Sequence, residues 1–237
     1  MSENLFDTYI EFSYSKLNIT TFNKKSGGIE HSHEKDYKIY FFNNEELKFN
    51  KLSTIVEKNI LEVEKLINKF IKDVYLIIET PETTSIKLSV TKNNEGKKIN
   101  KKNIMYLIQD GKQQILKSNK SISIIHIIVE NYNLDNVNYK FLPLDIKCKN
   151  FSIDINFICF PKNLLENFEQ LFLKQQIYIN QFICSNYLKK FNFENKEQNI
   201  CQVGRKIVNG FNKQEVVSIP KTIKKHGFFE KLFHFFG

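Results

Sequence analysis

The sequence predicts an α+β fold in which helices pack against a mixed β-sheet and a flexible tail follows. Runs of alternating apolar and polar residues near the N-terminus are typical of strands. Residues 52–70, 101–117 and 161–174 instead show the three- and four-residue apolar spacing of amphipathic helices. The chain has 237 residues, 41% hydrophobic and 26% charged, so it can bury a core and has a globular composition.

The first part of the chain predicts strands. Residues 7–13 and 17–22 alternate at period two and are separated by a turn at Tyr14-Ser15-Lys16. A second turn is expected at Ser26-Gly27-Gly28, and residues 37–42 predict a third strand.

A long helix is predicted next, because its apolar residues recur on one face while most of its acidic residues lie on the other. Those apolar residues are Leu52, Ile55, Val56, Ile60, Val63, Leu66, Ile67 and Phe70. Strands are expected at residues 73–79 and 86–92. Asn100 is a suitable N-cap for a helix that runs to about Lys117.

The second half predicts further strands and one more helix. Residues 122–130 read as a buried strand, and residues 137–142 and 151–160 are expected to pair with each other. Pro161 suits the first turn of a helix. Residues 177–183 form a last strand or short helix, which could cover a sheet edge that a second subunit would otherwise cover.

We divide the chain into a folded domain at residues 1–188, a polar linker at 189–226 and a C-terminal amphipathic helix at 227–237. The linker is rich in Lys, Asn and Gln and shows little apolar period. In the helix the apolar residues share one arc of about 160°. They are Phe228, Phe229, Leu232, Phe233, Phe235 and Phe236.

This helix predicts a membrane contact. A phenylalanine-rich face in water favours aggregation, whereas insertion at a lipid interface buries it, and Lys224, Lys225 and Lys231 can meet anionic headgroups. Two alternatives use the same face: the helix docks on the core of its own domain, or it enters a groove of a partner protein.

No catalytic, cofactor-binding or metal-binding residues are predicted. His31 and His33 lack a third ligand nearby and read as part of a solvated loop, and His126 reads as a satisfied core residue. Cys159 and Cys184 lie in apolar runs and read as small buried hydrophobes. No nucleophile, phosphate-loop or metalloprotease motif occurs, so an enzyme is not expected.

The charge leaves a nucleic-acid binder as an alternative. Lys and Arg total 35 against 26 acids, a net charge of +9, yet the lysines form scattered doublets and Arg205 is the only arginine. Because arginine makes the bidentate contacts that read bases, we do not expect nucleic acid as a partner. With no apparent signal peptide or membrane-spanning run, the expected location is the cytosol.

The order of these parts resembles FtsA, the actin-like bacterial cell-division protein, in shortened form. Residues 7–22 look like the opening hairpin of the actin-like fold, residues 52–190 like the strand-helix-strand-strand subdomain called 1C, and the C-terminal helix like the membrane-targeting helix of FtsA. Within residues 52–190 the resemblance is carried by four segments: 71–79, 98–104, the strand around His126 and 143–160. Residues 156–183 resemble the strand and helix that lead back to the actin-like core.

The resemblance departs at the phosphate loop. The family carries a loop of the type Asp-Ile-Gly-Thr-Ser-Lys where this chain has Glu11-Phe12-Ser13-Tyr14-Ser15-Lys16. Ser13 replaces the glycine that lets backbone amides approach phosphate, and Tyr14 adds bulk. We therefore expect no cofactor, and no contact with the tubulin-like protein FtsZ by the usual route.

The resemblance implies a non-enzymatic adaptor of cell division. Its 1C-like domain would contact other division proteins or further copies of itself, and its C-terminal helix would hold it on anionic lipid at the inner face of the cell membrane. The alternatives are an ATP-binding protein of the actin superfamily with unusual loops, and the lysine-rich nucleic-acid binder.

Overall fold

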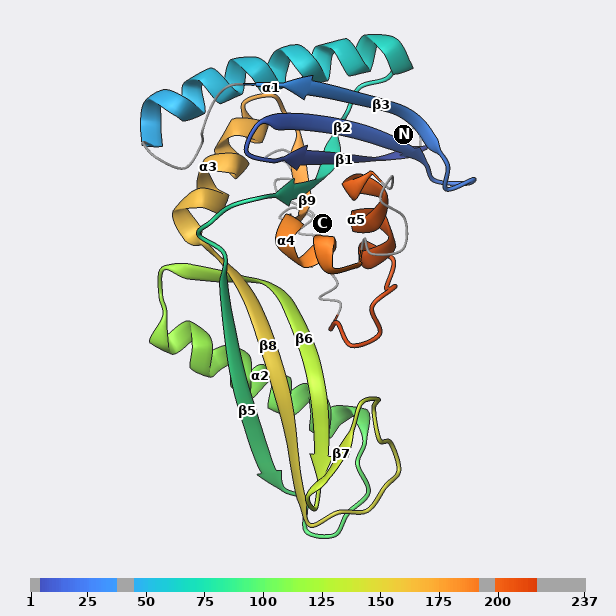
Figure 1. The fold of residues 1–237 in the computed structure, drawn as a ribbon, viewed down its shortest axis with the longest axis vertical. Helices are drawn as coiled ribbons and strands as arrows, with labels where there is room; N and C mark the ends of the chain where they lie inside the picture. Colours follow the sequence, from blue (N-terminus) through green and yellow to red (C-terminus); the bar gives the residue numbers. More distant parts are fainter. Residues whose placement is uncertain (1–4, 38–44, 192–198, 217–237) are drawn as a thin grey trace, which may run out of the picture.

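The computed structural model describes residues 5–37, 45–191 and 199–216. Two units lie end to end, each built on its own sheet (Figure 1). The first contains a five-stranded sheet with helices on both faces, and the second a four-stranded sheet with one helix. The predicted α+β class is confirmed, but the fold has two sheets rather than one.

The first sheet is mixed. Its strands are β1 (Phe6–Phe12), β2 (Lys16–Asn23), β3 (Ile29–Asp36), β4 (Asp73–Ile78) and β9 (Tyr178–Cys184), in the order β3-β2-β1-β4-β9. The first three pair antiparallel, whereas β1, β4 and β9 are parallel. The predicted strand at 177–183 is thus β9, which covers the edge of β4, while β4 covers the edge of β1.

One face of this sheet packs against helices α1 (Glu45–Ile67) and α3 (Lys162–Leu173). The rings of Phe12 on β1 and Phe168 on α3 lie 5.0 Å apart, and Phe49 of α1 lies 5.5 Å from Phe168. α1 begins earlier than predicted and ends at Ile67, so Phe70 lies beyond it, and both Leu66 and Phe70 are exposed rather than on the buried face. α3 follows Pro161 as expected. These aromatic contacts and the apolar stripe of α1 form the larger of two cores.

The third strand was predicted at the wrong place. The prediction put it at Tyr37–Phe42 and put His31 and His33 in a loop, but β3 spans Ile29–Asp36 and contains both histidines. Residues 38–42 lie outside the described part of the chain. β3 is an exposed edge strand, so its side chains are polar and do not alternate, and its position is set by backbone pairing with β2.

The second unit contains β5 (Thr84–Asn93), α2 (Lys101–Ser118), β6 (Ile122–Leu134), β7 (Val137–Tyr139) and β8 (Asn150–Pro161). The strand order is β5-β8-β6-β7, with all neighbours antiparallel. Asn100 and Asn103 form a reciprocal capping box, which confirms the predicted start of α2. Inward residues of β8, such as Phe151 and Phe157, fill the core under α2.

Two expectations about this unit are corrected. The strand-helix-strand-strand order occurs, but over residues 84–161 rather than 52–190, because α1 and β4 belong to the first unit. Residues 137–142 do not pair with 151–160: β7 pairs with β6, since the tight turn at Asp135-Asn136 returns the chain along that strand. β8 lies instead between β5 and β6.

The predicted linker at 189–226 is contradicted by ordered structure. After α4 (Ser185–Leu188) and a 3₁₀ turn, η1 (Lys189–Phe191), helix α5 (Ile200–Val208) packs on the second face of the first sheet. Gly204 helps it lie close to the sheet, because a Cβ there would lie 2.9 Å from Cδ1 of Ile77 and the isoleucine side chain would have to shift. Ile200, Val203 and Ile207 do recur at helical spacing, and the prediction missed this short run because polar segments rich in Lys, Asn and Gln flank it.

Within the residues described, none of the helices combines the length and the apolar character needed to cross a bilayer. The C-terminal helix predicted at 227–237 lies outside the described residues, as do positions 192–198 and 217–226 of the predicted linker.

Candidate functional site

Charged side chains gather where the parallel strands β1, β4 and β9 end. Glu11 is the penultimate residue of β1, Glu79 follows β4, and Lys189 follows the short helix after β9. Ligands of α/β sheets bind at this edge, outside the carboxyl ends of the strands. The β1–β2 turn, which the FtsA resemblance places at the phosphate loop, lies at the same edge.

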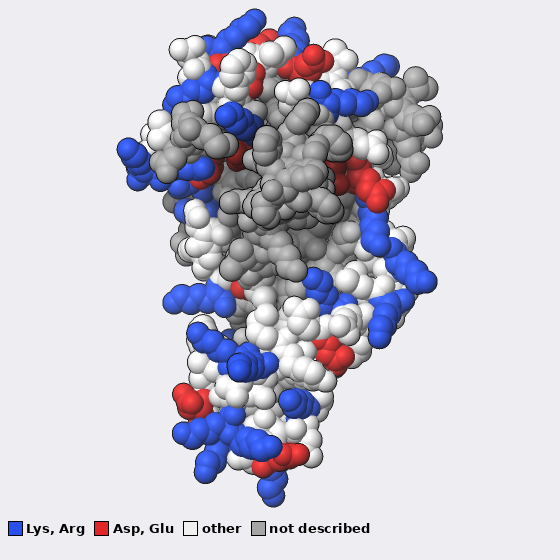
Figure 2. Space-filling view, turned by 180° about the vertical axis from the view of Figure 1, so that it is seen from behind, with Lys and Arg blue, Asp and Glu red and all other residues white. Residues whose placement is uncertain are grey.

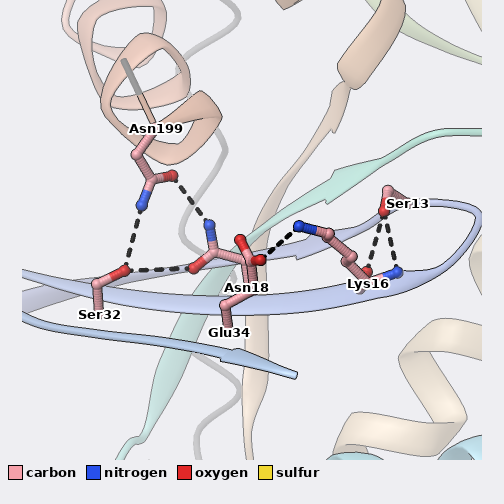
Figure 3. A network of polar contacts seen from close by, with 6 residues as sticks. All are labelled: Ser13, Lys16, Asn18, Ser32, Glu34 and Asn199. Atoms are coloured by element: carbon pink, nitrogen blue, oxygen red, sulfur yellow. Dashed lines mark hydrogen bonds and ion pairs between the residues drawn. The ribbon is translucent and has the colours of Figure 1, made fainter. Parts of the chain in front are cut away.

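The β1–β2 turn is closed by its own hydrogen bonds (Figure 3). The Ser13 N–H donates to the carbonyl of Lys16 at 3.0 Å, and the Lys16 N–H donates to Oγ of Ser13 at 3.1 Å. The Tyr37 hydroxyl donates to the Ser13 carbonyl, and the Tyr37 N–H to the carbonyl of Ser15. A phosphate cradle needs amide N–H groups that point to a ligand. In this turn the N–H groups of Ser13 and Lys16 instead donate to acceptors of the turn itself.

Lys16 is directed along the sheet to β3 rather than across the strand ends. Its Nζ lies 2.5 Å from Oε1 of Glu34, and this hydrogen bond raises the pKa of Lys16 (Figure 3). Both side chains are about half exposed, at 49% and 52%, so the ion pair contributes little to stability. It does, however, place an acid beside the cation that would otherwise meet a phosphate.

Glu11 is the most perturbed carboxyl group at this edge. Burial and the neighbouring carboxylate of Glu79 raise its pKa to about 7, although Lys189 and a hydrogen bond from Asn18 act in the opposite direction. Lys189 forms an ion pair with Glu79. At neutral pH, Glu11 is therefore poised between its charged and neutral forms, which makes it a proton acceptor or donor of moderate strength.

The charges of this edge are already paired. Glu34 pairs with Lys16 and Glu79 pairs with Lys189, so each ammonium group that could meet a phosphate already has a carboxylate partner. Among the described residues, no three His, Cys, Asp or Glu side chains come together in a way that would hold a metal ion.

Helix α5 is fixed above the same sheet by an amide network (Figure 3). The Oδ1 of Asn199 caps the helix by accepting from the Cys201 N–H at 2.9 Å and accepts from Nδ2 of Asn18 at 3.0 Å. Its Nδ2 donates to Thr20 and Ser32 at 3.0 and 3.2 Å. The Asn199 side chain thus uses both its oxygen and its amide group, and α5 occupies the face onto which Glu11 and Asn18 project.

A second polar cluster lies where the two units meet. The buried imidazole of His126 accepts from the Cys184 N–H at Nε2, 3.0 Å away, and its Nδ1 lies 2.7 Å from Oε1 of Glu215. Since a backbone N–H can only donate, Nδ1 carries the proton and donates to the carboxylate. The Tyr187 hydroxyl donates to Oε2 of Glu215 at 2.7 Å. His126 is a satisfied core residue, as predicted.

The segment that carries Glu215 pairs with the edge of β6. The Val129 N–H donates to the carbonyl of Gln214 at 2.9 Å, and the Val216 N–H donates to the carbonyl of Ile127 at 2.8 Å. This short bridge brings the end of the described chain to the middle of the molecule. The sequence did not predict this bridge or the role of Glu215, because a single Glu in a polar segment forms no pattern that indicates a buried partner.

The other residues singled out from the sequence fall in different places. The predicted membrane-binding residues, 224–236, lie outside the described residues. His33 contacts Asn59 of α1 at 2.8 Å. Cys159 and Cys184 are buried, as predicted, and burial raises the pKa of both thiols. Arg205 donates to the carbonyl of Gly27 beside a cavity of about 390 Å³ at the end of α5, which Glu11 does not line.

The fold recurs in a solved structure. The structure titled the PilM–PilN type IV pilus biogenesis complex matches at a TM-score of 0.52 and 7% identity, over 79% of this chain and 50% of that chain. The chain thus shares its fold. No protein-family description and no curated protein sequence matches it.

Two further structures match at lower scores. The cytoplasmic domain of EpsL, an inner-membrane component of the type II secretion system of Vibrio cholerae, has a TM-score of 0.39, 7% identity and coverages of 77% and 58%. A Bacteroides thetaiotaomicron protein described as having an actin-like ATPase fold and unknown function has a TM-score of 0.35, 12% identity and coverages of 82% and 58%. The chain spans about half to three fifths of these three structures. The specific resemblance to FtsA stays a prediction.

Replacing Glu11 by Gln is expected to stabilise the protein at alkaline pH. The raised pKa of Glu11 means that folding favours its protonated form, so its contribution is present below about pH 4.5 and is lost as pH rises through about 7. Glu11→Gln should raise the free energy of unfolding by about 1–3 kcal/mol near pH 8.5 and change it little near pH 4.5. Urea unfolding at both pH values measures this, with Glu57→Gln on the exposed face of α1 as the control. Equal effects of Glu11→Gln at both pH values would contradict it.

Removing Glu215 is expected to destabilise the junction. Glu215→Ala leaves the buried Nδ1–H of His126 and the hydroxyl of Tyr187 without their acceptor, which should cost about 2–4 kcal/mol of unfolding free energy. Gln214→Ala is the matched control, because Gln214 contributes its backbone carbonyl to the β6 bridge. Urea unfolding in which the two variants lose equal stability would show that the cluster does not hold the junction.

Proposed function

We propose that this protein is a non-enzymatic adaptor that is tethered to the inner face of the cell membrane and binds other proteins of a membrane-associated assembly. The observation that carries this proposal is the closed β1–β2 turn. Ser13 and Lys16 form hydrogen bonds with each other, and the ammonium group of Lys16 forms an ion pair with Glu34. A chain with this fold but without a phosphate cradle is suited to binding rather than to nucleotide turnover.

The identity of the assembly follows from resemblance. The FtsA-like order of parts favours cell division, with the unit at residues 84–161 as the protein-binding module and self-association as a further contact. The solved structure with the same fold is that of the PilM–PilN complex of type IV pilus biogenesis, which supports a role in protein assembly for this chain. The ATP-binding reading remains the alternative for this chain.

The tether is assigned to the phenylalanine-rich segment at 228–236. Each Phe or Leu side chain that leaves water contributes about 1.5–3 kcal/mol before ordering costs, and each lysine near an anionic surface adds about 1 kcal/mol. Several such residues together give reversible binding to lipid.

Shortening the chain is expected to release it from lipid. The full chain should float with vesicles that contain phosphatidylglycerol, whereas a chain ending at His226 should bind much more weakly, because it lacks the apolar residues of the tether. Flotation of both chains with the same vesicles is the measurement. If both chains float equally, the tether is assigned to the wrong segment.

The protein is expected not to bind ATP tightly. Calorimetric titration of the full chain with ATP and Mg²⁺ should give no saturable heat at micromolar concentrations, because the Ser13 and Lys16 amides are engaged within the turn and the Lys16 ammonium group is paired with Glu34. Charge reversal of the acid that pairs with Lys16, Glu34→Lys, is the comparison, because it frees the Lys16 ammonium group. Tight, magnesium-dependent binding by the unaltered chain would support the ATP-binding alternative instead.

A further inference from the structure

Exposed apolar side chains gather at the end of the second unit that lies farthest from the first. Here the β5–α2 loop, residues 94–100, meets residues 137–149, which include β7 and the loop to β8; we call this surface the distal tip (Figure 1). Phe141 is 75% exposed, a large fraction for a phenylalanine. The other large hydrophobic residues exposed here are Val137, Leu142, Leu144 and Ile146. Such clustering marks an interaction site.

The backbone under these side chains is ordered by pairing between the two loops. The Ile99 N–H donates to the carbonyl of Ile146 at 2.9 Å, and the Asp145 N–H donates back to the carbonyl of Ile99 at 3.0 Å. The side chains of Ile99 and Cys148 are buried and anchor the loops to the core of the unit. The exposed residues are therefore held outward by a formed structure, so binding would cost little ordering entropy.

The surface around these apolar residues is basic. Figure 2 shows lysines around the lower end of the molecule with few acids among them. On the distal tip, the adjoining β6–β7 turn and the first turn of α2, the lysines are Lys97, Lys98, Lys101, Lys102, Lys140, Lys147 and Lys149, and the acids are Glu95, Asp135 and Asp145. Glu95 is already paired with Lys97, and the Asp135 carboxylate accepts from the N–H groups of Lys149 and Asn150. Positive charge therefore dominates.

We propose that the distal tip is a second membrane-binding surface, which inserts Phe141 and its apolar neighbours between the headgroups of anionic lipid. The chemistry favours lipid over a protein partner, because protein interfaces are depleted in lysine and enriched in arginine, and the distal tip has five lysines, the first turn of α2 adds two more, and neither has an arginine. Lysine ammonium groups reach lipid phosphates while their methylene stems lie along apolar surface.

The position of the distal tip allows it to act with the C-terminal segment, and in this respect the inference rests on the proposed function. The described chain ends at Val216, which pairs with Ile127 on β6, and the strand from there to Leu134 covers about 23 Å. Residues 217–237 can span at most about 70 Å. Both surfaces can therefore reach one membrane, and two linked contacts bind more tightly than either alone.

The test compares variants of the full chain in flotation with vesicles of phosphatidylcholine alone or mixed with phosphatidylglycerol. Phe141→Ser with Leu144→Ser removes two apolar side chains of the distal tip. Leu66→Ser with Phe70→Ser is the matched control, because Leu66 and Phe70 are 65% and 79% exposed at the other end of the molecule. Phe229→Ser with Phe233→Ser disables the C-terminal segment in the same full-length chain.

The distal-tip variant should bind the anionic vesicles at least about tenfold more weakly than the unaltered chain, and the control should bind as the unaltered chain does. The variant of the C-terminal segment should keep a weak, salt-sensitive binding to the anionic vesicles. A variant that carries the substitutions of both the distal tip and the C-terminal segment should lose this remaining binding. Circular dichroism and urea unfolding should show that all variants are folded.

The outcomes separate this inference from the proposed tether. If the distal-tip variant binds as its control does while the variant of the C-terminal segment fails, the second surface is refuted and the tether stands. If the reverse holds, the distal tip stands and the tether is refuted. Two results would overturn anionic lipid as the occupant of the distal tip. The first is that the unaltered chain binds vesicles of phosphatidylcholine alone as well as it binds the anionic vesicles. The second is that, in sedimentation without vesicles, the unaltered chain forms a dimer and the distal-tip variant does not.

Discussion

The arrangement of the two units depends on the position of His126 within β6. The pairing of β6 with β8 shifts register between Ile124 and His126, so the strand bends there and directs neighbouring side chains into different cores. Ile125 and Ile128 pack with the first unit, whereas Ile124 and Ile127 pack with the second. The imidazole lies between them and meets β9 and the segment of Glu215. One buried polar group thus connects both units to the end of the described chain.

The same logic of satisfied polar groups underlies the proposal that the strand ends do not bind a nucleotide. A phosphate-binding turn keeps its amides directed at a ligand and its surroundings positive, whereas this turn uses Ser13 and Lys16 to close itself and has acids around it. Asn199 fastens α5 over the same face. In the turn, these contacts occupy an amide and an ammonium group that a phosphate would need.

The two surfaces proposed to bind lipid share one composition. The distal tip presents Phe141 on a paired and ordered loop, and the C-terminal segment carries its own phenylalanines beyond Val216. Lysine accompanies both, in a chain whose excess of basic residues is almost entirely lysine. Lysine carries a compact charge without the fixed donor geometry of arginine. Such a composition suits the proposed contact with a layer of anionic lipid headgroups better than a partner that requires directional hydrogen bonds.

The sequence by itself determined the α+β class, the capped start of α2 at Asn100, the helix after Pro161 and the buried state of His126, because these follow from periodicity, capping and local apolar context. Only the tertiary structure decided the rest. It placed β3 at an edge of the sheet, where exposed polar side chains give no alternating pattern from which the strand could be predicted. It also packed α5 at Gly204 against Ile77 and paired β7 with β6. The perturbed Glu11 and the Glu215 partner of His126 arise from contacts between residues far apart in the sequence, and no local pattern records such contacts.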